Sequence, residues 1–486
     1  MDISSSGLSS SEKRKLLAKL LAQRQTNQLP LTFAQQRLWY IEQRCTGLPV
    51  YIVPGVFRLR GELDVEALRR CLDYIVDRQE TLRVTFCVKD EQVWQFIHPS
   101  RSTSLTVYEL ESLPIEQREA HACLLIEREL ETPFDFRTGP LFRSLLLKLS
   151  SHEHLLVFNL HNIIADGWSI GILYREFSQV YAAFREGQSS PLSPLPLRYT
   201  KFIQNLYHDF QGNLLERECA YWRKKFRELP RLKLPPAPRI DSYASHSGGA
   251  VEFSIAADVV IGLRALARSQ GATLFMSLLA AFGAYLHLYL QQDRLVVATP
   301  VANRNHTSLE GLMGMFVTTL VLHVDLRGMP TFRTLLARIR AETKESYAHP
   351  QVPFNNLLAD LPFPDSDARN PLAHFMLAYH GSIVQPFTLP QLEIDSVQST
   401  LKTSGYELEL HLSDNLETSL SSQEQLGGLS GELYHSDRFD SSTVAQIVFD
   451  FQSLVRCLIS EPDLSIAAFP ARLNRLTTTL APLDPH

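Results

Sequence analysis

The chain has 486 residues, of which 45% are hydrophobic and 20% are charged, as expected for a globular protein with two or three hydrophobic cores. The formal net charge of −5 provides no basic field for nucleic acid or an anionic membrane, and no apolar stretch reaches the ~18 residues of a membrane-spanning helix. The six cysteines are scattered without a CxxC pair, so we expect no metal site, no disulfide scaffold and a cytoplasmic location.

Residues 1–28 predict a leader helix. Ser9 and Glu12 form a capping-box pattern, and leucines follow with helical spacing at positions 16, 17, 20 and 21. Such a helix either packs on the domain that follows it or links that domain to a neighbouring protein. Its amphipathic pattern favours packing.

From residue 31 onward the apolar patterns alternate between helix and strand. In chain order they predict a helix over 34–44, a strand over 55–60, a helix over 65–76, strands over 82–88 and 92–97, a helix over 115–130, strands over 141–149 and 154–160, and a helix over 168–186. A four-residue polar turn between the last two strands predicts a hairpin. We interpret His152 and His154, which flank Glu153 there, as solvated turn residues rather than metal ligands.

Two Pro-containing segments, 188–197 and 229–239, predict linkers. After the second, the patterns predict a strand over 250–253, helices over 257–269 and 272–289, strands over 294–299 and 317–324, and a helix over 331–347. The sequence therefore predicts an α/β (α+β) fold in two similar halves, with mixed, locally antiparallel sheets that carry helices on a face.

The most informative segment is His161-Asn162-Ile163-Ile164-Ala165-Asp166-Gly167-Trp168-Ser169. An apolar strand ends here and a long helix begins, which places polar groups at a buried strand end, a frequent position for functional sites. Asp166 is placed to cap the helix, Gly167 permits a tight backbone, and free N–H groups could face an oxyanion. On these residues alone a plain cap, a turn and a satisfied interior His161 explain the pattern equally well.

Other segments accompany this one in a definite order. They are 32–40 (TFAQQRLWY), 77–86 (DRQETLRVTF), 300–304 (PVANR), 314–319 (GMFVTT), 349–354 (HPQVPF), 368–372 (ARNPL) and 428–433 (GLSGEL). Each motif alone is weak, but the ordered series over roughly residues 30–475 resembles the condensation domains of nonribosomal peptide synthetases. Three positions depart from that family. Asn162 replaces the second His of HHxxxDG, Gln79 replaces a His, and Thr318 replaces a usual Asn.

The resemblance implies two chloramphenicol acetyltransferase-like lobes, over 29–197 and 198–486, in a V-shaped pseudo-dimer with a central tunnel. Donor and acceptor carrier proteins, themselves parts of a synthetase with further domains, would each insert a phosphopantetheine arm, and the domain itself would bind no cofactor. Asp166 would pair with Arg304 across the lobes, and Arg83 would be structural. The resemblance places Trp168, Ser169, Thr318 and Thr319 along the tunnel, with Asn162, His161, Asp166 and Gly167 at the reacting centre.

The reaction that the resemblance implies is attack of a carrier-bound amine on a donor thioester to form an amide. An asparagine cannot take the amine's proton at neutral pH, although its oxygen can accept a hydrogen bond and its amide N–H can donate one to an oxyanion. A general base is typically worth ~10²–10⁴-fold, whereas alignment of two tethered reactants can contribute more. His161 is not expected to replace the base, because adjacent residues of an extended segment point to opposite faces.

Three interpretations of Asn162 stay open: an engineered substitution that disables the site, a natural domain that only docks carrier proteins, and a natural enzyme with a positioning amide. Gln79 and Thr318 favour natural divergence over a single engineered change. A third function, ester formation with a hydroxyl acceptor, is disfavoured because an alcohol needs a base more than an amine does. We expect His349 and His380 to lie in the core or the tunnel wall.

Overall fold

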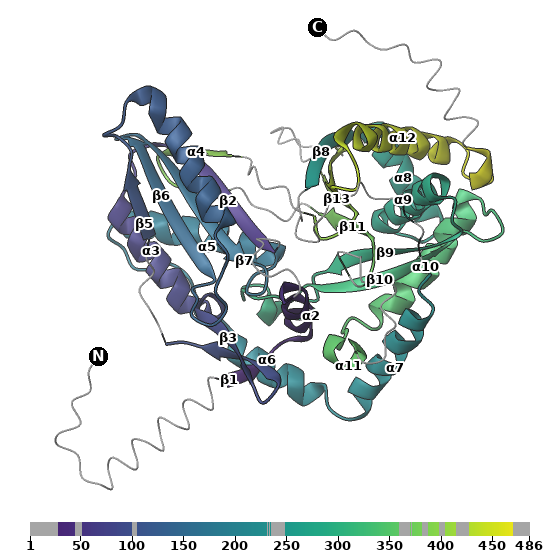
Figure 1. Ribbon diagram of the computed structural model, residues 1–486, viewed down its shortest axis with the longest axis horizontal. Helices are drawn as coiled ribbons and strands as arrows, with labels where there is room; N and C mark the ends of the chain where they lie inside the picture. The colour runs from purple at the N-terminus through teal and green to yellow at the C-terminus, as the bar shows by residue number, and fades with distance from the viewer. Residues whose placement is uncertain are drawn as a thin grey trace.

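The computed structural model describes residues 28–43, 51–99, 105–230, 232, 234, 248–358, 370, 372–381, 387–397, 404–414 and 427–469. The predicted leader helix, most of the linker over 229–239 and most of the motif over 368–372 lie outside the described residues. Within them, the chain forms two α/β lobes that meet at a junction and spread apart as a V (Figure 1). The predicted two-lobed α/β fold is confirmed.

The first lobe is built on a five-stranded sheet with the spatial order β12-β2-β7-β6-β5. Its strands are β2 (Ile52–Gly61), β5 (Leu105–Glu109), β6 (Phe142–Ser150), β7 (Glu153–His161) and β12 (Leu392–Ser396). The predicted hairpin is confirmed, since β6 and β7 pair antiparallel, whereas β5 pairs parallel with β6.

Strand β7 is buried on both faces of this sheet, which explains its continuous apolar run. Leu156 and Phe158 pack in the same core as the helices α3 (Val65–Arg78) and α5 (Gly167–Arg185), and Leu155 and Val157 pack with α4 (Ile115–Glu131) on the opposite face. The strand therefore delivers the residues after His161 into the interior of the molecule.

Helix α2 (Phe33–Glu42) and a small sheet of β1 (Gln28–Pro30), β4 (Gln92–Ile97) and β3 (Val84–Lys89) extend the first lobe toward the junction. Thr32 and Gln35 form a capping box, because each side chain accepts a hydrogen bond from the other residue's backbone N–H, at 3.2 and 3.0 Å. The Gln35 Nε2 also donates to the carbonyl of Ile163 at 2.9 Å. Helix α2 therefore supports the loop that follows β7.

The second lobe is built on a six-stranded sheet with the spatial order β10-β9-β11-β13-β14-β8. Its strands are β8 (Gly248–Ile255), β9 (Arg294–Val301), β10 (Thr318–Asp325), β11 (Phe375–His380), β13 (Leu408–Asp414) and β14 (Leu429–Ser436). One face is covered by α8 (Ala257–Ser269), α9 (Leu274–Leu290), α10 (Phe332–Tyr347) and α12 (Ser441–Ser460). On the opposite face, α7 (Asn213–Arg227) and α11 (Phe354–Leu358) contribute Trp222 and Phe354 to a third apolar cluster.

Within the described residues, helix α12 is long and apolar enough to cross a membrane, as are α8 and α9 together if that bent pair is taken as one span. The apolar residues of α12, among them Val444, Ile447 and Phe451, are buried in the core of the second lobe. Packing on the sheet accounts for their apolar character.

The chain crosses between the lobes more than once. Helix α6 (Tyr199–Asp209) buries Tyr199 and Ile203 in the core of the first lobe, although it falls in the range expected for the second. Strand β12 likewise pairs with β2, from Leu392 opposite Gly61 to Ser396 opposite Phe57. Both segments come after residue 198 in the chain but pack or pair with the first lobe. The lobe boundary at 197/198 stays a prediction.

Several elements begin where a local interaction sets the boundary. The strand predicted from residue 82 begins at Val84, because Glu80–Arg83 form a 3₁₀ turn, η1. The helix predicted from residue 272 begins at Leu274, because the Thr273 side chain caps it. Strands β5 and β11 were not anticipated from the sequence. They pair in parallel with β6 and β9, and no local sequence pattern predicts a pairing between segments so far apart.

Gln79, which stands where the family motif has His, connects the two lobes. Its buried Nε2 donates to Oε2 of Glu176 at 3.0 Å and to the carbonyl of Gly311 at 3.1 Å, and its Oε1 accepts from the N–H of Met313 at 3.1 Å. A neutral imidazole offers one donor and one acceptor and cannot make all three bonds. The amide is therefore explained by the structure as a cross-lobe bridge.

Gln79→Ala should lower the free energy of unfolding by about 2–4 kcal/mol, because it leaves the Met313 N–H and a Glu176 oxygen without this partner in the interior. Urea denaturation followed by tryptophan fluorescence measures the change. The matched control is Gln117→Ala on the exposed face of α4, expected to change stability by less than ~0.5 kcal/mol. Equal, small effects of the two substitutions would contradict the bridge.

Candidate active site

The loop between β7 and α5 lies at the junction of the lobes and is held from both sides. The N–H of Asn162 donates to the carbonyl of Tyr51 at 2.8 Å, just before β2. The N–H of Asp166 donates to the carbonyl of Gly314, in the second lobe, at 3.3 Å. The backbone of this loop is thus fixed relative to both lobes.

Asp166 is the centre of a buried polar cluster. One carboxylate oxygen, Oδ1, caps α5 by accepting from the N–H of Ser169 at 2.8 Å, and the other, Oδ2, accepts from the N–H of Phe316 at 3.1 Å. Arg304 Nη2 lies 3.1 Å from Oδ1, and both side chains are only 2% exposed. The pair that the resemblance implied is present, and together with the Phe316 contact it joins helix α5 to two segments of the second lobe.

Arg304 has further acceptors that fix its orientation. Its Nη1 donates to the carbonyls of Leu309 and Leu312, and its Nη2 also lies 3.1 Å from the Ser169 hydroxyl. Burial lowers the pKa of Arg304, and the neighbouring Asp166 carboxylate opposes that shift. The guanidinium, 4.1 Å from the centre of the Phe316 ring, stays charged because an arginine pKa lies far above neutrality.

His161 is a fully satisfied interior histidine. Its Nδ1 accepts from the N–H of Ile163 at 3.0 Å, so the ring proton is on Nε2, which lies 2.9 Å from Oε1 of Glu42. The ring is 3% exposed and packs edge-on against Phe136 at 4.8 Å. Both nitrogens are occupied, so His161 holds the loop and is not placed to serve as a base.

Asn162 is the exception in this loop. Its backbone is fixed by Tyr51 and by the N–H of Ala165, which donates to its carbonyl at 3.3 Å. Its side chain is partly exposed and makes no hydrogen bond to any residue that the structure describes. An amide on a rigid backbone, with its own oxygen and NH₂ unused, is available to a bound reactant.

The space beside Gly167, the first residue of α5, is open. A Cβ added at Gly167 would meet nothing within 4 Å, so neither crowding nor a left-handed backbone requires a glycine at this position. Trp168, whose Nε1 donates to the carbonyl of Glu310 at 3.1 Å, follows it on the second-lobe side. The N–H groups of Gly167 and Trp168 have no partner within the described part of the chain, which leaves the helix start free to face an anion.

Thr318 and Thr319 open strand β10 on the second-lobe side and are nearly buried. The Thr318 hydroxyl accepts a long hydrogen bond, 3.4 Å, from Nδ2 of Asn303, a residue in the left-handed region with φ 51° in the loop that leads to Arg304. Burial raises the pKa of the Tyr406 hydroxyl, and its hydrogen bond with Thr319 opposes the rise. Thr318 thus contacts the loop of Arg304, and the place of both threonines along a tunnel stays a prediction.

Arg83 lies elsewhere. Its guanidinium donates to the carbonyls of Val76, Asp77 and His98, which tie the end of α3 to β4. Burial lowers the pKa of Arg83. Its contacts are structural, as the resemblance implied, and none of them reaches the loop 162–166.

The remaining histidines within the described residues form no metal site. No group of three or more His, Cys, Asp or Glu among the described residues is arranged to hold a metal ion. His349 pairs with the buried Glu218 at 3.0 Å and stacks on Tyr221 with ring centres 3.8 Å apart. Its role is therefore packing between α7 and the segment after α10.

Glu42 and Tyr51 support the loop and were not anticipated from the sequence. Gln35 was noted as part of a motif, but its contact with the loop was not anticipated. Gln35 was visible within the opening motif, but its contact with Ile163 spans 128 positions of the chain. Glu42 and Tyr51 carried no signal, because their roles depend on long-range contacts with the loop.

The comparisons with known proteins agree with this fold. A family model described as "Condensation domain" matches residues 25–471, so the chain belongs to the condensation domain family. This is the family that the ordered sequence motifs resemble, that of the condensation domains of nonribosomal peptide synthetases.

A linear gramicidin synthase protein of Brevibacillus parabrevis is 36% identical over 445 residues, which are 91% of this chain and 6% of that protein. Chondramide synthase of Chondromyces crocatus is 35% identical over 446 residues, which are 90% of this chain and 11% of that protein. The chain thus spans a small part of the length of these curated relatives.

Among solved structures, the X-domain from teicoplanin biosynthesis superposes with a TM-score of 0.77 at 25% identity, covering 90% of this chain and 96% of that one. The starter condensation domain of rhizomide synthetase superposes with a TM-score of 0.74 at 18% identity, covering 91% and 98%. At 18% identity, the likeness to the rhizomide synthetase domain shows a shared fold and nothing further.

Asp166→Ala should lower the free energy of unfolding by about 3–5 kcal/mol, because it strands the buried Arg304 charge and removes the cap of α5. Asp463→Ala is the matched control. It breaks the exposed Arg333–Asp463 pair and should cost less than ~1 kcal/mol. Chemical denaturation of the three proteins measures both changes, and comparable losses would show that Asp166 does not anchor the junction.

Proposed function

We propose that this domain catalyses amide formation between two carrier-bound substrates, with Asn162 as the residue that positions the reactants. The observation that carries the proposal is the contrast within one loop. Asp166, Ser169 and His161 are committed to the protein, whereas the Asn162 side chain is uncommitted on a rigid backbone at the lobe junction.

In the proposed step, the neutral amine of the acceptor attacks the carbonyl carbon of the donor thioester. The Asn162 oxygen accepts a hydrogen bond from the attacking N–H and orients the nitrogen lone pair toward that carbon. The free N–H groups at the start of α5 face the oxyanion that develops.

The proton balance does not require a resident base. As the C–S bond breaks, the departing thiolate of the donor arm takes up the proton that the acceptor nitrogen loses, so an amide and a free thiol form. An α-amino group with a pKa near 7.7–8.0 is partly neutral at physiological pH. Positioning by an amide is therefore sufficient for turnover, at a lower rate than a base would give.

The partners follow from this reaction. Both substrates are thioesters on the phosphopantetheine arms of donor and acceptor carrier proteins, which belong to the same synthetase or to neighbouring ones. The relatives are far longer synthases of which this chain matches one section, which supports such an arrangement. A cytoplasmic location fits the scattered thiols, since Cys71, Cys87, Cys123, Cys219 and Cys457 form no disulfide within the described residues.

Asn162→Ala should reduce dipeptide formation by about 10–100-fold, because it removes one hydrogen bond that aligns the amine. Donor and acceptor carrier proteins loaded with aminoacyl groups are mixed with each variant, and the dipeptidyl thioester is quantified by mass spectrometry. Asn205→Ala, an exposed asparagine of α6, is the matched control and should leave the rate unchanged. Asn162→His tests how much a base would add, with ~10²–10⁴-fold as the upper range.

Each outcome separates the interpretations. If the parent outpaces the Ala variant, Asn162 positions the amine as proposed. If parent and Ala variant are both silent while carriers still bind, the domain is a docking platform. If only the His variant is active, the parent site is disabled, and if hydroxyl acceptors react instead of amines, the domain forms esters.

A further inference from the structure

We propose that residues 13–24 of the leader segment dock as an amphipathic helix on the outer face of the small sheet of β1, β4 and β3. The sequence left two uses open for this segment, packing on the domain or contact with a neighbouring protein. The small sheet lies where the leader joins the first lobe, because β1 begins at Gln28 (Figure 1). The inference concerns the framework of that lobe and does not depend on the proposed reaction.

The two faces of the small sheet differ in what covers them. Phe86 and Ile97 point inward and belong to the core of the first lobe. Trp94, Phe96 and Cys87 point to the opposite, outer face, because side chains alternate along a strand. These three side chains are half-buried, and no hydrophobic cluster of the described residues includes them. The outer face is therefore apolar and is not part of any described core.

The strand register gathers these side chains beside β1. Trp94 lies directly opposite Pro30 on one side and opposite Cys87 on the other, and Phe96 lies opposite Gln28. Side chains in directly opposite positions have Cβ atoms about 4.5–5.5 Å apart, so Pro30, Trp94 and Cys87 form one apolar row. The indole N–H of Trp94 makes no hydrogen bond to a described residue. The strand that continues the leader is thus the edge of the apolar surface.

The leader carries a complementary apolar stripe. Its leucines at positions 16, 17, 20 and 21 share one side of a helix, because residues three or four apart lie on the same face. A helix this short is marginal on its own in water, so the stripe needs an apolar surface to be stable. Residues 25–27 keep the helix within about 15 Å of Gln28, which makes docking on the adjacent face intramolecular.

Length and charge favour the same arrangement. A helix over 13–24 is about 18 Å long, and β4 is about 17 Å long. A helix that turns back along β4 from Phe96 places the basic residues 13–15 (KRK) beside the turn between β3 and β4. That turn carries the exposed carboxylates of Asp90 and Glu91, which attract the basic end of the helix.

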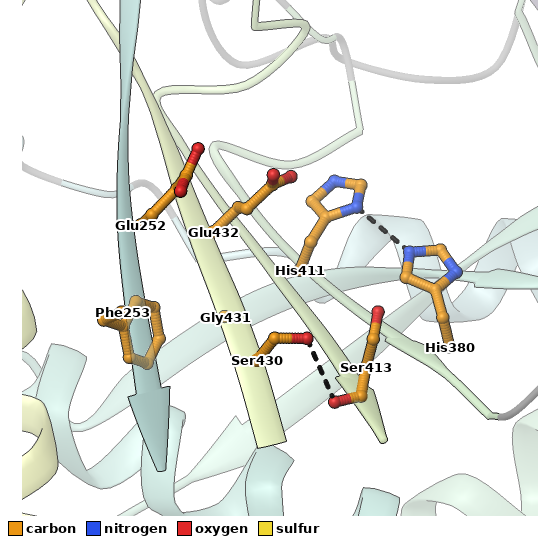
Figure 2. A pocket seen from close by; sticks show the side chains of 8 residues that line it. All are labelled: Glu252, Phe253, His380, His411, Ser413, Ser430, Gly431 and Glu432. Atoms are coloured by element: carbon orange, nitrogen blue, oxygen red, sulfur yellow. Dashed lines mark hydrogen bonds between the residues drawn. The ribbon is translucent and has the colours of Figure 1, made fainter. Parts of the chain in front are cut away.

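The cavity on the second sheet does not offer such a surface. It has a volume of about 300 Å³ and is lined among others by Glu252, Glu432, His380 and His411 (Figure 2). Nε2 of His380 lies 3.0 Å from Nδ1 of His411, so these side chains are engaged with each other. Leucine side chains above such polar groups would remove their hydration without replacing it. The stripe of the leader therefore matches the small sheet and not this cavity.

The test measures how fast N-ethylmaleimide alkylates Cys87 in the whole chain, with the labelled peptides quantified by mass spectrometry. The exposed Cys123 of α4 serves as the internal reference in the same sample. Leu16→Glu combined with Leu20→Glu should raise the rate at Cys87 about tenfold or more, because two carboxylates on the stripe oppose its burial and uncover the thiol.

The matched control is Lys19→Glu combined with Ala22→Glu, which places two glutamates on the opposite side of the same helix. It should leave the rate at Cys87 within about twofold of the parent. Equal rates in the parent and the leucine variant would overturn the proposal, as would an equal rise in the control. Thermal unfolding of each variant checks that the domain remains folded.

A cross-linking arm identifies what covers the face. The Leu20→Cys variant is treated with a short bismaleimide at low micromolar concentration, and the expected product is a link to Cys87 within one chain. Links between two chains would show that a second copy covers the face. The absence of any link to Cys87 would indicate that the leader extends toward a neighbouring protein. Either of these two results would overturn intramolecular docking.

Discussion

The buried ion pair between Asp166 and Arg304 is the constraint on which the site depends. It joins the start of α5 in the first lobe to the loops before β10 in the second, and it collects Ser169, Phe316 and the carbonyls of Leu309 and Leu312 into one cluster. A buried pair is weak as a source of net stability, because both charges lose their hydration. Its geometry, however, tolerates few arrangements, so it fixes how the two lobes meet and therefore where the loop between β7 and α5 lies.

In the loop between β7 and α5, some residues hold the backbone in place and Asn162 is available to a reactant. His161 is held by Glu42 and by the backbone of Ile163, and Gln35 binds the next carbonyl, so the residues on both sides of Asn162 cannot move freely. The side chain of Asn162, which has no hydrogen bond to a described residue, is left for a reactant. Such a site favours alignment, which suits an amine that is already partly neutral and a thiolate that can take up the proton it loses.

The departures from the family motifs have different physical meanings. Gln79 makes three cross-lobe hydrogen bonds that an imidazole cannot make together, so it is explained as part of the framework. Thr318 keeps a polar contact with Asn303 beside Arg304. The Asn162 side chain makes no hydrogen bond to a described residue, so its role depends on the molecule that binds beside it.

The sequence by itself determined the family, the two-lobed α/β fold and the hairpin of β6 and β7, because these are recorded in local periodicity and in motifs of fixed order. The pairing of Asp166 with Arg304 was implied by the family resemblance. Only the tertiary structure decided that His161 is satisfied, that Gly167 faces open space, and that α6 and β12 pack with the first lobe. It also placed Glu252, Glu432, His380 and His411 around one cavity. The physical reason is that each of these features depends on strands and helices that are far apart in the chain, and local pattern carries no record of which distant segment fills a given space.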